Sequence, residues 1–241
     1  MPAGLFRFDN LSDRTDAKVT FDWYAELCRQ QPGTVTGVKL VSGHIQSDDK
    51  EALKAQERAY GDIVYNFRYL TDQERNSLFP NPSKHAIHFT SYAAEGNQYV
   101  PYLKKQLLDL GVLFVERVVK NIDEIEKITK IKIIQLAEEG YEVIVNSAGL
   151  NAGDLAGDDD GVYPIRGVAF EGAKILSEWC GLRPARASIR VESQKKLTKS
   201  GKKYTLVHHY GHGGHGFTVG WGSALRAAAL VDQAIRDRAK L

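Results

Sequence analysis

A strand, a glycine-rich loop and a helix follow one another over residues 204–240, and no other segment constrains the fold as strongly. In the strand, side chains alternate between two faces, so His208 and His209 are expected to point in opposite directions. The loop GHGGHG, at 211–216, holds more glycines than a hairpin requires. Such a loop at a helix N-terminus offers bare backbone N–H groups and partial positive charge. The segment therefore predicts a site for an anionic or electron-rich group, such as a phosphate or a flavin ring.

The rest of the chain predicts alternating helices and strands. A helix over 13–29 is indicated by Ala17, Phe21, Tyr24 and Cys28, which share one helical face. Elsewhere we expect strands over 35–45, 63–69, 85–92, 112–119 and 143–145, a helical turn over 72–78 and a connection over 46–60. Two further helices are expected. The apolar face of the first contains Tyr99, Leu103, Leu107 and Leu110, and that of the second contains Ala224, Ala228, Val231 and Ile235.

Composition excludes several classes of protein. With 241 residues, 43% hydrophobic and 26% charged, the chain is long enough for one large or two modest globular domains. The formal charge is +2 and no basic block carries interleaved aromatic residues, so a nucleic-acid partner is not expected. No apolar run approaches the ~18 residues of a membrane span. The N-terminus lacks the features of a signal peptide, and two cysteines cannot form a disulfide framework, which together favour an intracellular protein.

Two clusters of polar residues are candidates for chemistry. Arg183, Arg186 and Arg190 lie in a strand-like run, where a guanidinium could bind a carboxylate through two parallel hydrogen bonds or form a surface ion pair. Four histidines, His208, His209, His212 and His215, could supply zinc ligands. Their spacing fits no known zinc motif, so no metal is expected, and strand alternation is the simpler explanation.

These segments resemble a known family. GLRPAR at 181–186 followed by HHYGHGGHGFTVGWG at 208–222 resembles the C-terminal signature of the D-amino-acid oxidase and D-aspartate oxidase family, FAD-dependent oxidases of peroxisomes. Further matching segments follow in the family's order: AGLF at 3–6, LVSGHI at 40–45, HFTSYAAEGNQYVPYL at 88–103, VIVNSAG at 143–149 and YPIRG at 163–167.

The resemblance implies roles for individual residues. Arg183 matches the arginine that binds the substrate's α-carboxylate, and Gly214 offers its backbone to the substrate. Val119 matches a backbone position beside the adenine half of FAD. The remaining FAD contacts implied are Ala3, Gly4 and Leu5 beside the flavin, and the loop Gly213, Gly214, His215, Gly216, Phe217 and Thr218 against it.

The implied reaction is oxidative deamination of a neutral D-amino acid or of D-aspartate. The α-hydrogen leaves as hydride to the flavin, the imine product hydrolyses to a keto acid and ammonia, and oxygen reoxidises the flavin to give hydrogen peroxide. The cofactor supplies the redox chemistry while the protein supplies orientation and a charge clamp, so no catalytic side chain is assigned. Arg186 and His215 are candidates for favouring an acidic substrate.

The implied fold is the family's α/β plan in shortened form, with the whole chain, 1–241, as one region. FAD-binding parts are expected at about 1–34, 93–160 and 204–241, and a reduced mixed-sheet substrate domain at about 35–92 and 161–203.

Three departures from the family's pattern leave a second interpretation open. The chain begins without the strand and G-x-G-x-x-G turn that hold the FAD pyrophosphate. Only 13 residues separate YPIRG from Gly181, an interval in which the family holds much of its substrate domain, and residues 127–135 look inserted. The alternative is therefore a catalytically inactive, truncated relative that acts as a binding protein or has no activity.

The last three residues suggest a location. Ala239-Lys240-Leu241 is close to the tripeptide read by the peroxisomal import receptor, or it is simply a solvated helix end. Together with the resemblance, it predicts a peroxisomal protein that is cytosolic before import.

Overall fold

The computed structural model describes residues 3–8, 11–115, 136–137, 139–166, 181–198 and 200–239. The chain divides into two compact units. Unit 1 comprises Met1–Leu113 and His215–Gly222, and unit 2 comprises Phe114–Gly214 and Ser223–Leu241. The two units are defined by which residues pack together, and they do not show which residues bind FAD or substrate. The expected division into FAD-binding and substrate-binding parts therefore stays a prediction.

Unit 1 contains an antiparallel sheet of four strands. Its central strand is β4, His85–Glu95, which pairs with β1, Ala3–Leu5, and β2, Val38–Ser47. Strand β3, Tyr65–Tyr69, also pairs with β4. The sequence predicted β2, β3 and β4 to within a few residues, since each combines β-branched or aromatic residues with alternating burial.

The helices of unit 1 include one that the sequence analysis missed. Residues 50–60, expected in a connection, form a helix because Asp49 caps its first turn by accepting a hydrogen bond from the backbone N–H of Glu51 at 2.9 Å. This helix buries Leu53, Ala59 and Tyr60 at helical spacing beneath a charged surface, so its polar composition concealed it. The helical elements of unit 1 are η1 Leu11–Asp13, α1 Arg14–Gln30, α2 Gly33–Thr36, α3 Lys50–Tyr60, α4 Asp72–Leu78 and α5 Gly96–Asp109.

The core of unit 1 is a cluster of aromatic rings. Phe21 on α1 lies edge-on to Phe6, Tyr65 and Tyr92, with ring centroids 5.0–5.2 Å apart. Edge-to-face pairs at this separation add to the stabilisation that burial of the rings provides. Together these rings form what we call the aromatic cluster, which consists of Phe6, Phe8, Phe21, Tyr24, Tyr60, Tyr65, Phe89, Tyr92 and Tyr99.

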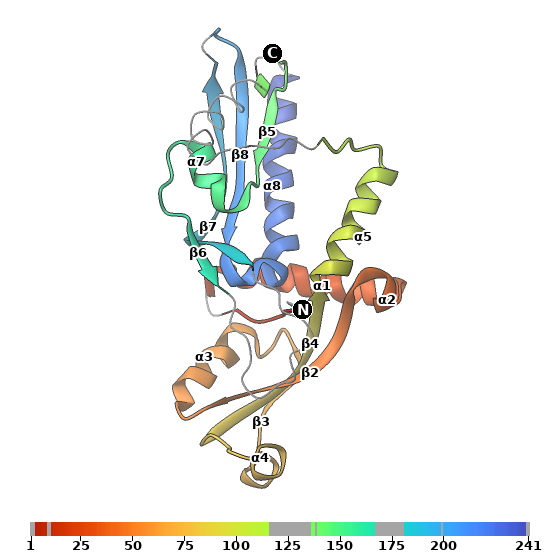
Figure 1. The fold of residues 1–241 in the computed structure, drawn as a ribbon, viewed down its shortest axis with the longest axis vertical. Helices are drawn as coiled ribbons and strands as arrows, with labels where there is room; N and C mark the ends of the chain where they lie inside the picture. Colours follow the sequence, from red (N-terminus) through yellow and green to blue (C-terminus); the bar gives the residue numbers. More distant parts are fainter. Residues whose placement is uncertain are drawn as a thin grey trace. The chain divides into compact units, whose positions relative to one another are not determined.

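Unit 2 contains a mixed sheet with strand order β5-β8-β7-β6. The long hairpin of β7, Leu182–Leu197, and β8, Lys203–His212, forms its centre (Figure 1). Strand β5, Val143–Asn146, runs parallel to β8, and β6, Tyr163–Arg166, runs antiparallel to β7. The helical elements are η2 Gly149–Asn151 and α7 Ala152–Ala156, followed later by η3 Gly213–His215 and α8 Gly216–Arg238, which cross from unit 2 into unit 1 and back. Both units mix helices and strands, in agreement with the expected α/β class.

Two predicted helix faces differ from the observed ones. On α8, Ala227 and Ala234 are buried while Ala228 and Ile235 are exposed. The hydroxyl of Ser223 lies 2.9 Å from both His209 and His212, which turns the Ser223 side of the helix toward β8. On α5 only Tyr99 of the expected face is buried.

The prediction of a strand over 112–119 is wrong in its first half. Of the strand predicted over 112–119, residues 112–115 are not in a strand, and 116–119 lie outside the described residues.

Candidate cofactor and substrate site

Arg183 and Gly214, the two residues predicted to bind substrate, lie side by side in unit 2. A Cβ at Gly214 would be 3.8 Å from Arg183 Nη1, and no other atom of the described residues lies within 4 Å of that position. The Arg183 side chain is exposed, and the described part of the chain offers it no ion pair or hydrogen bond. Among the described residues, the arrangement therefore presents a guanidinium whose donors have no partner next to a backbone position without a side chain.

Glycines bring this part of the loop close to β7. Gly211 and Gly213 have φ of +92° and +53°, a region that residues with a Cβ rarely adopt. A Cβ at Gly211 would be 2.9 Å from Arg186 Cβ, and one at Gly213 would be 3.3 Å from Ala185 Cβ. Larger residues at these positions would push the loop away from the strand that carries Arg183.

Arg186, expected to be a candidate for an acidic substrate, is already engaged. Its Nε donates to Asp159 Oδ2 at 2.9 Å, and its Nη1 donates to the backbone carbonyl of Ser188 at 3.0 Å. Asp159 is buried, with 5% of its side chain exposed. Of the two alternatives for Arg186, the structure shows the ion pair, with the difference that the expected surface pair has a buried carboxylate as its acceptor.

Arg190, itself buried, is the centre of an ionic cluster in which Asp159 is buried while Asp158 and Glu192 are exposed. It donates to both carboxylate oxygens of Asp158 at 2.9 and 3.0 Å, to Glu192 at 2.6 and 2.8 Å, and to the Tyr210 hydroxyl at 2.8 Å. Tyr210 in turn donates to Asp159 at 2.7 Å. We call these five residues the Arg190 network. Hydrogen bonds from Arg190 hold the pKa of Asp158 well below its usual range.

The Arg190 network positions the strands around Arg183. It fixes residues 158–159 against β7 and β8, shortly before β6 begins, and β6 pairs Ile165 with Arg183. The sequence analysis missed Asp158, Asp159 and Tyr210. The signal available to it was the run of three aspartates at 158–160 beside the arginine-rich strand.

The second half of the predicted flavin loop lies in unit 1. Thr218 is buried, and its hydroxyl accepts a hydrogen bond from the backbone N–H of Arg7 at 3.3 Å and donates to the carbonyl of Arg7 at 3.1 Å. The carbonyl of Phe217 accepts a hydrogen bond from Tyr24 Oη at 2.7 Å. Both residues thus join the start of α8 to the rest of unit 1, and their predicted contact with FAD stays a prediction.

The histidines of β8 lie on two faces, as predicted. His208 is fully buried, and neither ring nitrogen has a hydrogen-bond partner among the residues that the structure describes. Burial, followed by the charge of Arg190, lowers the pKa of His208 to about 4. His209 and His212 face the other way, toward Ser223. Within the described ranges no group of three or more His, Cys, Asp or Glu side chains is placed to hold a metal ion.

The predicted FAD contacts can be compared with the backbone that is present. The open side of Gly214 suits the approach of a flat, electron-rich ring. Beside Ala3–Leu5, which pairs with the end of β4, the described residues supply no strand, glycine turn and helix for the pyrophosphate. The residues present thus fit the flavin end of FAD. Val119, Lys240 and Leu241 lie outside the described residues, and Ala239 follows α8 in a turn.

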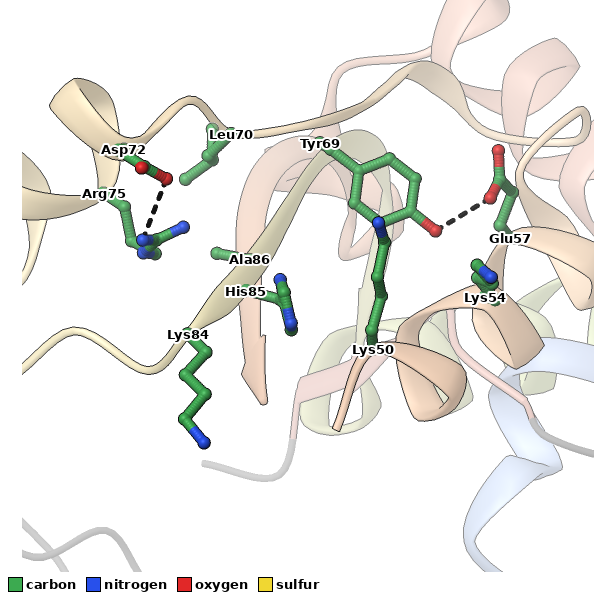
Figure 2. A pocket seen from close by; sticks show the side chains of 10 residues that line it. All are labelled: Lys50, Lys54, Glu57, Tyr69, Leu70, Asp72, Arg75, Lys84, His85 and Ala86. Carbon is green, nitrogen blue, oxygen red and sulfur yellow. Dashed lines mark hydrogen bonds and ion pairs between the residues drawn. The ribbon is translucent and has the colours of Figure 1, made fainter. Parts of the chain in front are cut away.

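A separate hollow of about 700 Å³ lies on unit 1 between α3, α4 and the start of β4 (Figure 2). Its floor contains Leu70 and Ala86, and its rim is basic. The acidic groups are already bound, because Tyr69 donates to Glu57 at 2.8 Å and Arg75 pairs with Asp72 at 3.0 Å. None of the predicted site residues lines it.

No helix in the described part of the chain is long and apolar enough to cross a membrane.

Comparison with known proteins gives consistent matches. The sequence model of the family described as DAO, FAD dependent oxidoreductase, matches residues 17–172. The chain is 48% identical to D-aspartate oxidase 1 of Caenorhabditis elegans, covering 98% of this chain and 86% of the relative. It is 45% identical to D-aspartate oxidase 2 of Caenorhabditis briggsae, with 97% and 86% covered, and 25% identical to D-aspartate oxidase of Homo sapiens, with 90% and 76% covered.

The length of the first of these matches shows that the chain is internally shorter than its relative. It extends over 297 aligned positions, whereas the chain has 241 residues, so at least 56 of those positions have no counterpart here.

Proposed function

This chain belongs to the family of FAD-dependent D-amino-acid and D-aspartate oxidases, and from that premise we propose that it oxidatively deaminates D-aspartate. The observation that supports the proposal best is the exposed guanidinium of Arg183, for which the described residues offer no partner, beside the open backbone of Gly214. Three relatives that cover at least nine-tenths of this chain are named D-aspartate oxidase, which favours D-aspartate over a neutral amino acid.

In the proposed complex Arg183 binds the α-carboxylate of the substrate through two parallel N–H···O bonds. Gly214 allows the substrate to approach the backbone, since a side chain there would occupy that space. Ala3–Leu5, Val119 and the loop 213–218 would hold FAD, which would supply the two-electron oxidation. The products are a 2-oxo acid, ammonia and hydrogen peroxide, with water and oxygen consumed.

The test begins with a titration of the purified chain with FAD, followed by the change in flavin absorbance. We expect saturable binding of one FAD per chain, and then peroxide release from D-aspartate that exceeds release from D-alanine. Arg183→Ala is expected to lower kcat/KM by about a hundredfold or more, because a charge-assisted bidentate contact is lost. Arg29→Ala, on the exposed surface of α1, is the matched control and is expected to leave kcat/KM unchanged.

A peroxide yield that survives Arg183→Ala would contradict the assignment of Arg183. A higher yield from D-alanine than from D-aspartate would contradict the substrate.

The second candidate is a relative without catalytic activity. It is favoured by the 56 or more aligned positions that this chain lacks and by the absence of a pyrophosphate turn among the described residues. For this candidate we expect no FAD binding and no peroxide from either amino acid, with a folded chain by circular dichroism.

We also propose that the tripeptide Ala239-Lys240-Leu241 directs the protein to peroxisomes through the import receptor. A fluorescent protein fused to the N-terminus is expected to co-localise with a peroxisomal marker. Removal of the three residues is expected to leave it in the cytosol, and unchanged localisation would contradict the proposal.

A further inference from the structure

The sheet of unit 1 carries a pair of histidines that directly face each other. His44 on β2 and His88 on β4 are partners in the strand register. His88 Nδ1 and His44 Nε2 lie 3.0 Å apart, and the two ring centroids are 4.8 Å apart. His44 is exposed and His88 is partly buried, so the pair is open to solvent.

We propose that His44 and His88 form a binding site for a late first-row divalent metal ion, with Cu²⁺ bound more tightly than Zn²⁺. A bond between a divalent metal and an imidazole nitrogen is about 2.0–2.1 Å long, so two such bonds meeting at about 95° span the observed separation. The two nitrogens thus already lie at the separation a chelated ion requires. The order of affinities follows from the general preference of nitrogen ligands for Cu²⁺.

The surroundings keep the two rings in place. The ring of Phe79 lies edge-on to His44, with centroids 5.8 Å apart. On the next cross-strand pair toward the β1 end of β4, Ser42 and Thr90 are joined by a hydrogen bond of 2.8 Å between their hydroxyls. Because both histidines stand on paired strands, binding requires little reordering of the backbone.

The neighbouring charges are already balanced. Arg68 on β3 is the register partner of His88 on its other side, and its guanidinium pairs with both carboxylate oxygens of Glu74 at 3.0 and 2.8 Å. Glu74 also accepts hydrogen bonds from Thr71. The Arg68 charge is therefore offset, and Glu74 is occupied, so solvent supplies the remaining ligands of the metal.

Metal binding replaces the hydrogen bond between the rings. In the metal-free pair one facing nitrogen donates its proton to the other. On binding, that nitrogen releases its proton to solvent while the outer nitrogen of the same ring takes one up. Both rings stay neutral and both facing lone pairs bind the metal, with no change of oxidation state.

The test uses the full chain without a polyhistidine tag, titrated with Cu²⁺ and separately with Zn²⁺ in a non-chelating buffer. We expect one Cu²⁺ per chain and an electron paramagnetic resonance spectrum with splitting from two imidazole nitrogens. His44→Asn and His88→Asn are each expected to weaken Cu²⁺ binding by about tenfold or more and to leave splitting from one nitrogen. His85→Asn, on the same strand but outside the pair, is the matched control and is expected to bind as the unaltered chain does.

Two results would overturn the proposal. One is Cu²⁺ binding that is unchanged in both variants but lost in His209→Asn, which would place the metal on β8. The other is a spectrum of the unaltered chain that lacks splitting from two imidazole nitrogens. The second result needs no variant, so it decides the question even if a substitution impairs folding.

Discussion

Unit 1 and unit 2 build their interiors from different chemistry. Unit 1 buries the aromatic cluster apart from the exposed ring of Tyr65, and many of these uncharged rings contact one another edge to face. Unit 2 has a smaller apolar cluster of Ala137, Ile144, Tyr204 and Leu206 and places the charged Arg190 network beside β7 and β8. The comparison indicates that packing dominates the stability of unit 1, whereas unit 2 depends on ionisation as well.

The sharpest test of the packing in unit 1 is Phe21→Ala. The ring of Phe21 contacts three other rings, so its removal leaves a cavity, and we expect a loss of about 3–5 kcal/mol in the free energy of unfolding. Urea unfolding followed by circular dichroism measures this loss. Phe79→Ala, at the partly exposed end of α4, is the comparison and is expected to cost much less. Equal losses in the two variants would show that the aromatic cluster has no special weight.

In unit 2 the corresponding test is Arg190→Met. The substitution removes the guanidinium, which is 8% exposed, from its close partner Asp158 and from Asp159, which lies 3.5 Å away. The buried carboxylate of Asp159 then keeps Arg186 as its ion-pair partner. We expect a loss of about 3 kcal/mol, measured by urea unfolding. Hydrogen exchange of peptides from β7 and β8 is expected to speed up more than that of β4. Uniform acceleration in both units would mean that the network does not act locally.

The two units are also expected to respond differently to pH. Burial lowers the pKa of His208 and of His212 to about 4, against about 6.5 in an unfolded chain. Between these values the unfolded chain binds more protons, so stability falls as the pH drops from 6.5 to 4, by about 3 kcal/mol per histidine at most.

The loss in unit 2 is expected to continue at lower pH. The pKa of Asp158 is lowered by Arg190, so the stability from this pair is present above the unfolded pKa of about 3.9 and is lost as the pH falls below it. Hydrogen exchange at pH 7.5, 5.5 and 4.5 measures the difference between β8 and β4 that the histidines cause, and a further measurement at about pH 3 measures the part due to Asp158. His208→Leu is expected to flatten the profile of β8, and an unaltered profile would exclude His208 as its source.

The smallest effect expected comes from two glycines on α8. At Gly222 a Cβ would collide with the backbone of Asp16, whereas at Gly220 it would meet no atom of the described residues within 4 Å. Gly222→Ala is therefore expected to destabilise unit 1 by about 1–3 kcal/mol. Gly220→Ala is expected to stabilise the helix by up to about 1 kcal/mol. Thermal unfolding measures both, and a shift of the same sign in both variants would contradict the close approach of α8 and α1.

In both units the sequence predicts some features and misses others. The helical spacing of apolar residues identified α1, and strand alternation identified β8 and the opposite faces of His208 and His209. Helix α3 was missed because its charged residues outweighed the apolar ones in a short segment. The engagement of Arg186 by Asp159 joins residues 27 positions apart, and such pairs have no local signal.

For the site, sequence motifs identified Arg183 and Gly214, which the structure brings together. They gave no indication of the Arg190 network. A motif records the residues that contact a ligand, whereas the residues that orient them are selected by packing across the sheet, which depends on the whole fold.

The path of α8 has a consequence for synthesis of the protein. Unit 1 requires its first 113 residues and also residues 215–222, which supply the stack of Trp221 on Trp23 and the hydrogen bond from Gly222 N–H to Thr20 at 3.0 Å. The ribosome translates the intervening hundred residues at about 5–20 residues per second. During that time Trp23 and Thr20 lack their partners Trp221 and Gly222, because these have not yet been synthesised. A nascent chain halted before residue 215 would expose that surface to chaperones, although every strand of its sheet has already been made.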